Sequence, residues 1–192
     1  EYNTSIQTPL RADAFDMDDA TKISKIEAHF SEIMNIMGLD LTDDSLKDTP
    51  KRVAKMFITE HFKGLNPANK PNLTLFENKY NYKQMVIEKD ISFYSNCEHH
   101  FVPIIGKAHI GYISSGTVFG LSKLNRIVDY FAKRPQVQER MTIQIAHELL
   151  DALKTEDVAV VIEAKHLCVS SRGIKDDTSL TTTSALFGKF LD

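Results

Sequence analysis

Residues 104–113, IIGKAHIGYI, decide the fold class because they include a run in which Ala108, Ile110 and Tyr112 alternate with His109 and Gly111. Ala108, Ile110 and Tyr112 fall on the same side of an extended chain. This period of two is typical of a β-strand with one buried face. The preceding stretch MVIEKDISFY, residues 85–94, is rich in strand-forming residues and predicts a neighbouring strand.

Two helices are predicted after these strands. Residues 121–134, LSKLNRIVDYFAKR, place Ile127 and Phe131 on one helical face, and Pro135 ends this helix. Residues 136–154, QVQERMTIQIAHELLDALK, form a longer second helix. Together they predict a helical pair that covers one face of the sheet.

Two further strands follow the helical pair. They are predicted over residues 157–173, DVAVVIEAKHLCVSSRG, and residues 179–187, SLTTTSALF. The order ββααββ indicates an α+β fold, with an antiparallel four-stranded sheet and the helical pair on one of its faces.

The first part of the chain is predicted to be an arm followed by helices. Apolar residues recur at helical spacing from Asp18 to Met37. A second helix begins at the sequence KDTPKRVAKMF, with Thr49 as its N-cap and Pro50 at its first helical position. We therefore divide the chain into an N-terminal arm and helical segment, residues 1–80, and a catalytic domain, residues 81–192.

Composition excludes several classes of protein. The chain has 192 residues, 42% of them hydrophobic, and a net charge of −3, which is not the basic excess of a nucleic-acid-binding protein. No apolar run approaches the roughly 20 residues of a membrane span. The acidic, polar start lacks the pattern of a secretion signal. We therefore expect a cytoplasmic protein without a nucleic-acid or membrane partner, whose two cysteines serve a metal or catalysis.

The sequence YSNCEHHFVP, residues 94–103, contains the first of these cysteines. Cys97 and His100 have a C-x-x-H spacing, which lets a tight turn present sulfur and imidazole nitrogen to one ion. Zinc accepts both ligand types. Taken alone, the pair is equally compatible with simple packing of a buried thiol against a histidine.

The second cysteine makes a metal site the leading interpretation. If the strand stays regular, His166, Cys168, Ser170 and Arg172 share one face, and Leu167 and Val169 point into the core. Each cysteine then lies beside a histidine, which two inert thiols would not require. We predict a zinc site of Cys97, His100 and Cys168 with an open fourth position. His99 and His166 are left to move protons, unless one of them is a fourth ligand that closes a structural site.

Several residues are candidates for binding an anion or a base. Lys123 and Arg126 are one helical turn apart, and Ser122 stands at the start of the same helix, where an anion is favoured. The alternatives are a solvated helix face and an ordinary N-cap. Glu139 with its neighbour Gln138 lies in the first turn of the next helix, where it either complements the helix dipole or accepts N–H bonds from a base. The stretch GTVFGLSK lacks the Gly-Lys-Ser/Thr ending of a phosphate loop, which excludes a Walker-type ATPase.

Three stretches together resemble GTP cyclohydrolase I, the zinc-dependent family that opens tetrahydrofolate and tetrahydrobiopterin synthesis. The first is SNCEHHFVPIIGKAHIGYI and the second is GLSKLNRIVDYFAKRPQVQER. The third is the C-terminal stretch that begins with AVVIEAKHLCVSSRGI and ends with TSLTTTSALFG. The resemblance extends from about Asp48 to Gly188. It implies a tunnelling fold, a toroidal homodecamer built as a dimer of pentamers, and active sites at subunit interfaces.

The resemblance also implies the reaction and the residue roles. GTP and water give 7,8-dihydroneopterin triphosphate and formate, through zinc-activated water attack on purine C8, ring opening, Amadori rearrangement and ring closure. The implied zinc ligands are Cys97, His100 and Cys168. The other implied roles are proton transfer for His99, His166 and Ser122, guanine binding for Glu139 and Gln138, and triphosphate binding for Lys123, Arg126, Arg172 and Arg52, the last from a neighbouring subunit.

Two rival functions remain open at this point. A pterin synthase or deazaguanine-handling enzyme shares the implied fold, and a catalytic-thiol version of it would leave Cys168 without a role. The non-enzymatic alternative is a ring-shaped assembly that binds purines without catalysis and holds a closed structural zinc. Removal of the metal separates these, since a structural site would lose its fold or assembly first.

Overall fold

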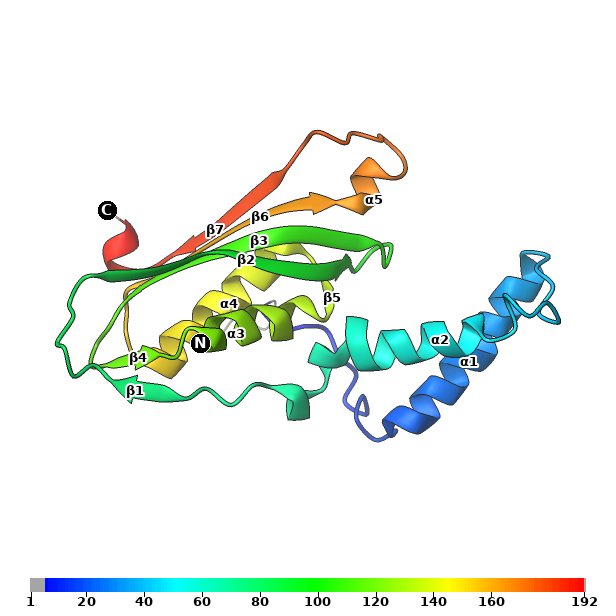
Figure 1. Ribbon diagram of the computed structural model, residues 1–192, viewed down its shortest axis with the longest axis horizontal. Coiled ribbons are helices and arrows are strands. Elements are labelled where there is room, and N and C mark those ends of the chain that lie inside the picture. Colours follow the sequence, from blue (N-terminus) through cyan, green and yellow to red (C-terminus); the bar gives the residue numbers. More distant parts are fainter. Residues whose placement is uncertain (1–5, 192) are drawn as a thin grey trace.

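The computed structural model describes residues 6–191 as a sheet backed by two helices, with a helical segment that extends from one end (Figure 1). The main sheet has five strands in the order β5-β2-β3-β6-β7. Their bounds are β5 Pro135–Gln136, β2 Met85–Cys97, β3 Pro103–Ile113, β6 Val158–His166 and β7 Thr181–Leu186. All neighbours are antiparallel except β2 and β5, which are parallel. The predicted α+β class and antiparallel core of the sheet are thus confirmed.

The strand count is one correction to the sequence prediction. Pro135 ends the first helix as expected, but it and Gln136 pair with β2 as a fifth strand, so the next helix begins at Gln138 and not at Gln136 as predicted. A second small sheet was also missed. In it, β1 (Leu75–Glu77) pairs with β4 (Thr117–Phe119). Strands this short carry too few residues for a period to be visible.

The core lies between the sheet and the helices α3 (Ser122–Ala132) and α4 (Gln138–Leu153), which cover the same face (Figure 1). The predicted inward residues of β3, Ala108, Ile110 and Tyr112, are buried. They meet the apolar stripes of both helices in one continuous cluster. Burial of this stripe, at about 25 cal/mol per Å² of apolar surface, fixes the helices on the sheet.

The strand predicted over residues 157–173 is shorter than expected. β6 ends at His166, opposite Ile104, and the chain then forms a single helical turn, α5 (Leu167–Ser170). Beyond this last pair the backbone has no strand partner, so a turn satisfies its polar groups instead. The strand alternation proposed for Cys168, Ser170 and Arg172 is therefore wrong, and Val169 is 38% exposed rather than in the core.

The N-terminal helices follow the prediction closely. α1 (Asp19–Ile36) is capped by Asp18, whose carboxylate accepts from the Thr21 N–H at 2.7 Å. α2 (Thr49–Met56) has Asp48 at the N-cap position, so the helix was predicted to start one residue too late: Thr49, not Pro50, is its first residue.

α2 continues into a π-helical turn, Phe57–His61, and 3₁₀ turns at Lys63–Leu65 and Pro67–Asn69. A last 3₁₀ turn, Gly188–Leu191, follows β7. Among the described residues, no helix combines the length and the apolar character needed to cross a bilayer.

Candidate metal centre

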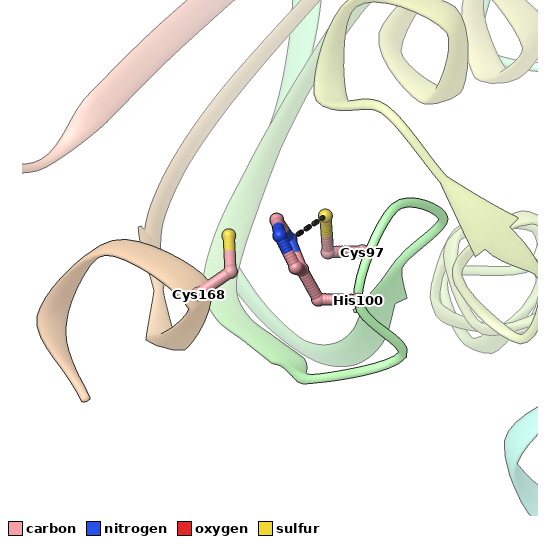
Figure 2. Close-up of side chains that lie close together, drawn as sticks. All are labelled: Cys97, His100 and Cys168. Carbon is pink, nitrogen blue, oxygen red and sulfur yellow. Dashed lines mark hydrogen bonds between the residues drawn. The ribbon is translucent and has the colours of Figure 1, made fainter. Parts of the chain in front are cut away.

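Three side chains converge at the end of the sheet where β2 and β6 finish (Figure 2). Cys97 is the last residue of β2, His100 lies in the turn that follows, and Cys168 lies on α5. One ligand atom from each lies within 4.8 Å of the other two. The structure thus brings together the three residues that the sequence proposed as ligands, although α5 rather than a strand presents Cys168.

The turn after β2 is held in place by backbone hydrogen bonds. Cys97 N–H donates to the Val102 carbonyl at 2.9 Å, and Phe101 N–H donates to the Cys97 carbonyl at 2.8 Å. Phe101 has a φ of 53°, the left-handed conformation that lets the chain reverse here. Its ring packs on Phe62 at 5.0 Å between centroids, so the N-terminal helical segment supports the turn from outside.

The surroundings of the Cys168 thiol disfavour its thiolate in the absence of a cation. Burial, and then the neighbouring Cys97 thiol, raise the pKa of Cys168 above its usual range. A metal cation held by the two sulfurs would oppose this effect, because it would stabilise the thiolates. Two thiolates and one imidazole are a donor set that fits zinc and leave its fourth position open.

Both additional histidines lie at this end of the molecule. His99 Nδ1 is 3.7 Å from Cys97 Sγ, and His99 Nε2 is 3.7 Å from a carboxylate oxygen of Glu98. His166 Nε2 is 2.8 Å from Gln138 Oε1. Burial lowers the pKa of His166, and the charge of Glu139 opposes this shift.

Gln138 is buried, and its amide group is used within the chain. Its Nε2 donates to the carbonyls of Ile162 and Thr181 at 3.0 and 2.9 Å. Since both partners are acceptors, the amide oxygen must be the atom that faces His166. His166 therefore donates from Nε2, and its neutral form has its free lone pair on Nδ1. Glu139 is exposed, and within residues 6–191 no hydrogen bond or ion pair holds its carboxylate.

The candidate phosphate-binding cations do not all lie with the metal ligands. Arg172 does, since its Nη1 is 3.1 Å from His100 Nε2. Lys123 donates to the Asn72 carbonyl at 3.0 Å near the start of α3, and Arg126 lines a surface cavity beside Lys63. These two lie elsewhere on the chain.

Two further candidates also lie apart from the ligands. Ser122 is the first residue of α3. Arg52, on the N-terminal helical segment, is exposed and pairs with Asp48 at 3.7 Å.

The distance between the start of α3 and the candidate metal ligands can be estimated along β2. Asn125, in the first turn of α3, donates to Glu88 of β2 at 2.6 Å, whereas Cys97 ends the same strand nine residues later. At about 3.3 Å per residue, and allowing for the bulge of β2 between Glu88 and Ile91, this places the start of α3 roughly 25–30 Å from the candidate metal ligands. Figure 1 shows the same arrangement, with α3 beginning beside β4 and α5 at the opposite end.

Comparison with known proteins identifies the family. The sequence model of the GTP cyclohydrolase I family matches residues 26–192. The chain belongs to the GTP cyclohydrolase I family. The GTP cyclohydrolase 1 of Flavobacterium johnsoniae is 60% identical over 191 residues, which are 100% of this chain and 86% of that protein. Those of Escherichia coli O1:K1 / APEC and Enterobacter sp. strain 638 are 54% and 52% identical over 185 residues, 96% of this chain and 83% of each relative.

Membership confirms the resemblance and the enzyme class that the sequence suggested. Sequence reasoning missed Arg140, in the first turn of α4, and gave Glu98 no role. One signal was available for Arg140. An arginine in the first turn of a helix opposes the helix dipole, so a specific partner is expected for it.

Proposed function

We propose that Cys97, His100 and Cys168 hold a catalytic zinc ion at which this chain opens the imidazole ring of GTP. The observation that carries the proposal is the convergence of the three ligand atoms within 4.8 Å, with His99 and His166 beside them. Two thiols and an imidazole fit zinc and leave room for water. Zinc, when bound, supplies Lewis acidity that lowers the pKa of water from 15.7 to about 7.

GTP cyclohydrolase activity follows from family membership: GTP and water yield 7,8-dihydroneopterin triphosphate and formate. In this reaction carbon C8 leaves the purine as formate after both of its bonds to nitrogen break. The ribose carbons then enter the new ring after an Amadori rearrangement. The steps need repeated proton transfer at nearby atoms, which one residue cannot supply alone.

Two histidines are suited to these proton transfers. His99 is 65% exposed at its side chain and lies beside Cys97, so it can reach the purine N7 and donate a proton as the ring opens. His166 is partly buried, and burial favours its neutral form. Its Nε2–H is engaged by Gln138, which leaves Nδ1 as the proton acceptor. The two imidazoles therefore act as donor and acceptor in the early steps.

The guanine end of the substrate is assigned to α4. Glu139 is an exposed carboxylate in the first turn, near enough to His166 for its charge to influence that pKa. A carboxylate accepts two N–H bonds from the guanine edge. Gln138 supports this binding indirectly, because its own amide is fully used by the two strands and His166.

The triphosphate end is completed by another copy of the chain. Arg172 lies beside the metal ligands, but Ser122, Lys123 and Arg126 are on α3, whose start lies roughly 25–30 Å away along β2. We propose that α3 of one subunit faces the metal centre of the next, with Arg52 also reaching in from a neighbour. A homodecamer of tunnelling-fold subunits arranged as a ring provides such interfaces, and Ser122 then contacts ribose or phosphate as a proton carrier.

The test is incubation of zinc-loaded protein with GTP, with assays for formate and for the fluorescent pterin formed on oxidation. His99→Ala is run beside it. The proposal predicts both products from the wild type and neither from the variant. Formate without pterin would restrict the chain to ring opening. Neither product from a zinc-loaded, assembled wild type would favour the idle purine-binding ring.

A further inference from the structure

One ion pair connects the turn that carries His99 to the helix that carries Glu139. Arg140 Nη2 donates to a carboxylate oxygen of Glu98 in a short contact. The Arg140 side chain is 10% exposed and that of Glu98 is 27% exposed, so solvent screens this pair far less than a surface pair. The pair bridges two segments that are 42 residues apart in the sequence.

The other oxygen of Glu98 faces His99. Its Oε1 is 3.7 Å from His99 Nε2, while Nδ1 on the opposite side of the ring is 3.7 Å from Cys97 Sγ. These two neighbours are the polar groups that flank the ring. Because the His99 side chain is 65% exposed, packing does little to limit its rotamers. The Glu98 carboxylate is therefore in a position to orient the imidazole.

Arg140 is itself held rigidly. Its Nε donates to Gln136 Oε1 at 3.2 Å, and its Nη2 also donates to the Pro135 carbonyl at 3.1 Å. Gln136 is completely buried and donates to the Phe131 carbonyl and to Gln144 Oε1. The guanidinium thus has a fixed direction, and the Glu98 carboxylate is fixed with it.

The same contacts also join the turn that carries His99 to the helix that carries Glu139. Glu98 N–H donates to the Gln136 carbonyl at 3.0 Å, so the turn after β2 is joined to β5 through its backbone as well. α4 begins directly after β5, and its first turn holds both Glu139 and Arg140. The proposed anchor for guanine and the proposed proton donor therefore share one support.

We propose that Arg140 is a positioning residue that acts through Glu98 to hold His99 at its working orientation relative to the base-binding carboxylate of Glu139. The inference rests on the proposed role of His99 in proton transfer. Neither Arg140 nor Glu98 needs to touch the substrate. A displacement of about 1 Å at a reacting group can cost about 100-fold in rate, which sets the scale of the effect.

The test compares Arg140→Met, Arg140→Lys, Glu98→Gln and the double variant Arg140→Met/Glu98→Gln in zinc-loaded, assembled protein. We expect kcat for pterin formation to fall about 10- to 100-fold in Arg140→Met and in Glu98→Gln, with KM for GTP changed by less than about twofold. Arg140→Lys recovers part of the loss because it keeps the charge. The double variant falls no further than the poorer single variant, since the two residues act as one unit.

A second ion pair on α4 supplies the matched control. Lys70 Nζ is 2.7 Å from Glu148 Oε2, and Glu148 is only 15% exposed. Lys70→Met and Glu148→Gln remove a comparable pair away from the turn after β2, and we expect kcat to stay within about twofold of the wild type. Zinc content and the unfolding temperature are measured for every variant.

Three results would overturn the proposal. They are a kcat loss in the Lys70 and Glu148 variants as large as in Arg140→Met, additive losses in the double variant, and losses that appear only in KM. If Arg140→Met does not fold, Glu98→Gln carries the same prediction, and wild-type kcat in that variant would refute it. Retained activity in His99→Ala would instead refute the proposed role of His99, which separates the two failures.

Discussion

The two ends of the sheet differ in how much of a site one chain builds. At the end where β2 and β6 finish, the three candidate metal ligands, the two histidines proposed for proton transfer and Arg172 come together within one chain. Lys123 and Arg126, on α3, lie apart from that group: Lys123 donates to the Asn72 carbonyl, and Arg126 lines a surface cavity beside Lys63. This difference fits the proposal that one subunit arranges the chemistry and that a second subunit completes the binding of the substrate.

The largest effect is expected at the metal end. Cys168→Ser removes one of the two sulfur ligands, so zinc content and formate production should both fall, the latter by roughly 1000-fold or more. Val169→Ser, at the next position of α5, is the matched control and should keep both. Full activity in a Cys168→Ser protein without zinc would show that the metal end does not carry the chemistry.

A smaller loss is expected at the other end. Lys123→Met removes one proposed charge-assisted contact to phosphate, worth about 1.5–3 kcal/mol, so kcat/KM should fall roughly 10- to 100-fold. Zinc content should not change, because α3 begins far from the ligands. Lys25→Met, on the exposed side of α1, controls for a general loss of positive charge. Loss of zinc in Lys123→Met would contradict the separation of the two ends.

The support that the helical segment gives to the metal end can be tested at Gly64. A Cβ atom at this position would lie 2.0 Å from the Tyr130 carbonyl oxygen and 2.8 Å from that of Lys133, both of them backbone atoms. Gly64→Ala should therefore lower the free energy of unfolding by about 1–3 kcal/mol. Chemical denaturation measures this change. An unchanged midpoint would mean that the segment docks less tightly than the contacts indicate.

The smallest effect concerns pH. Burial, and secondarily the charge of Lys133, lower the pKa of His61, which packs against the ring of Phe62. Between that lowered pKa and about 6.5 the unfolded chain binds a proton that the folded chain does not, so stability falls as pH decreases below about 6.5. In His61→Phe the decline in unfolding temperature should be shallower over this range. If the unfolding temperature falls with pH equally steeply in both proteins, His61 does not cause this pH dependence.

Much of this site could be predicted because local patterns specify it. The alternation of Ala108, Ile110 and Tyr112 predicted which face of β3 is buried, and the C-x-x-H spacing predicted that Cys97 and His100 lie close together. Cys168 does lie beside Cys97 and His100, as the sequence predicted, but it is presented by a different element. The reason is that α5 forms where β6 loses its strand partner, which is a tertiary event without a local signal.

Three other features could not be predicted from local sequence patterns, because they depend on short or distant pairings in the fold. The two residues of β5 are too few for periodicity, although their pairing with β2 sets the position of the turn that carries His99. The contact between Glu98 and Arg140 joins segments 42 residues apart, so neither residue reveals its partner locally. The hydrogen bonds that Gln138 Nε2 donates to the carbonyls of Ile162 and Thr181 likewise depend on how β6 and β7 pair.

The central claim is that each active site combines the metal end of one chain with the α3 cations of another. It is tested most directly by mixing two inactive variants in one assembly. Cys168→Ser is co-expressed in equal amounts with the double variant Lys123→Met/Arg126→Met, and formate production is measured on the purified hybrid. If sites are shared between subunits, random assembly restores roughly a quarter of wild-type activity. If each chain builds its own site, the hybrid shows only the average of the two inactive parents.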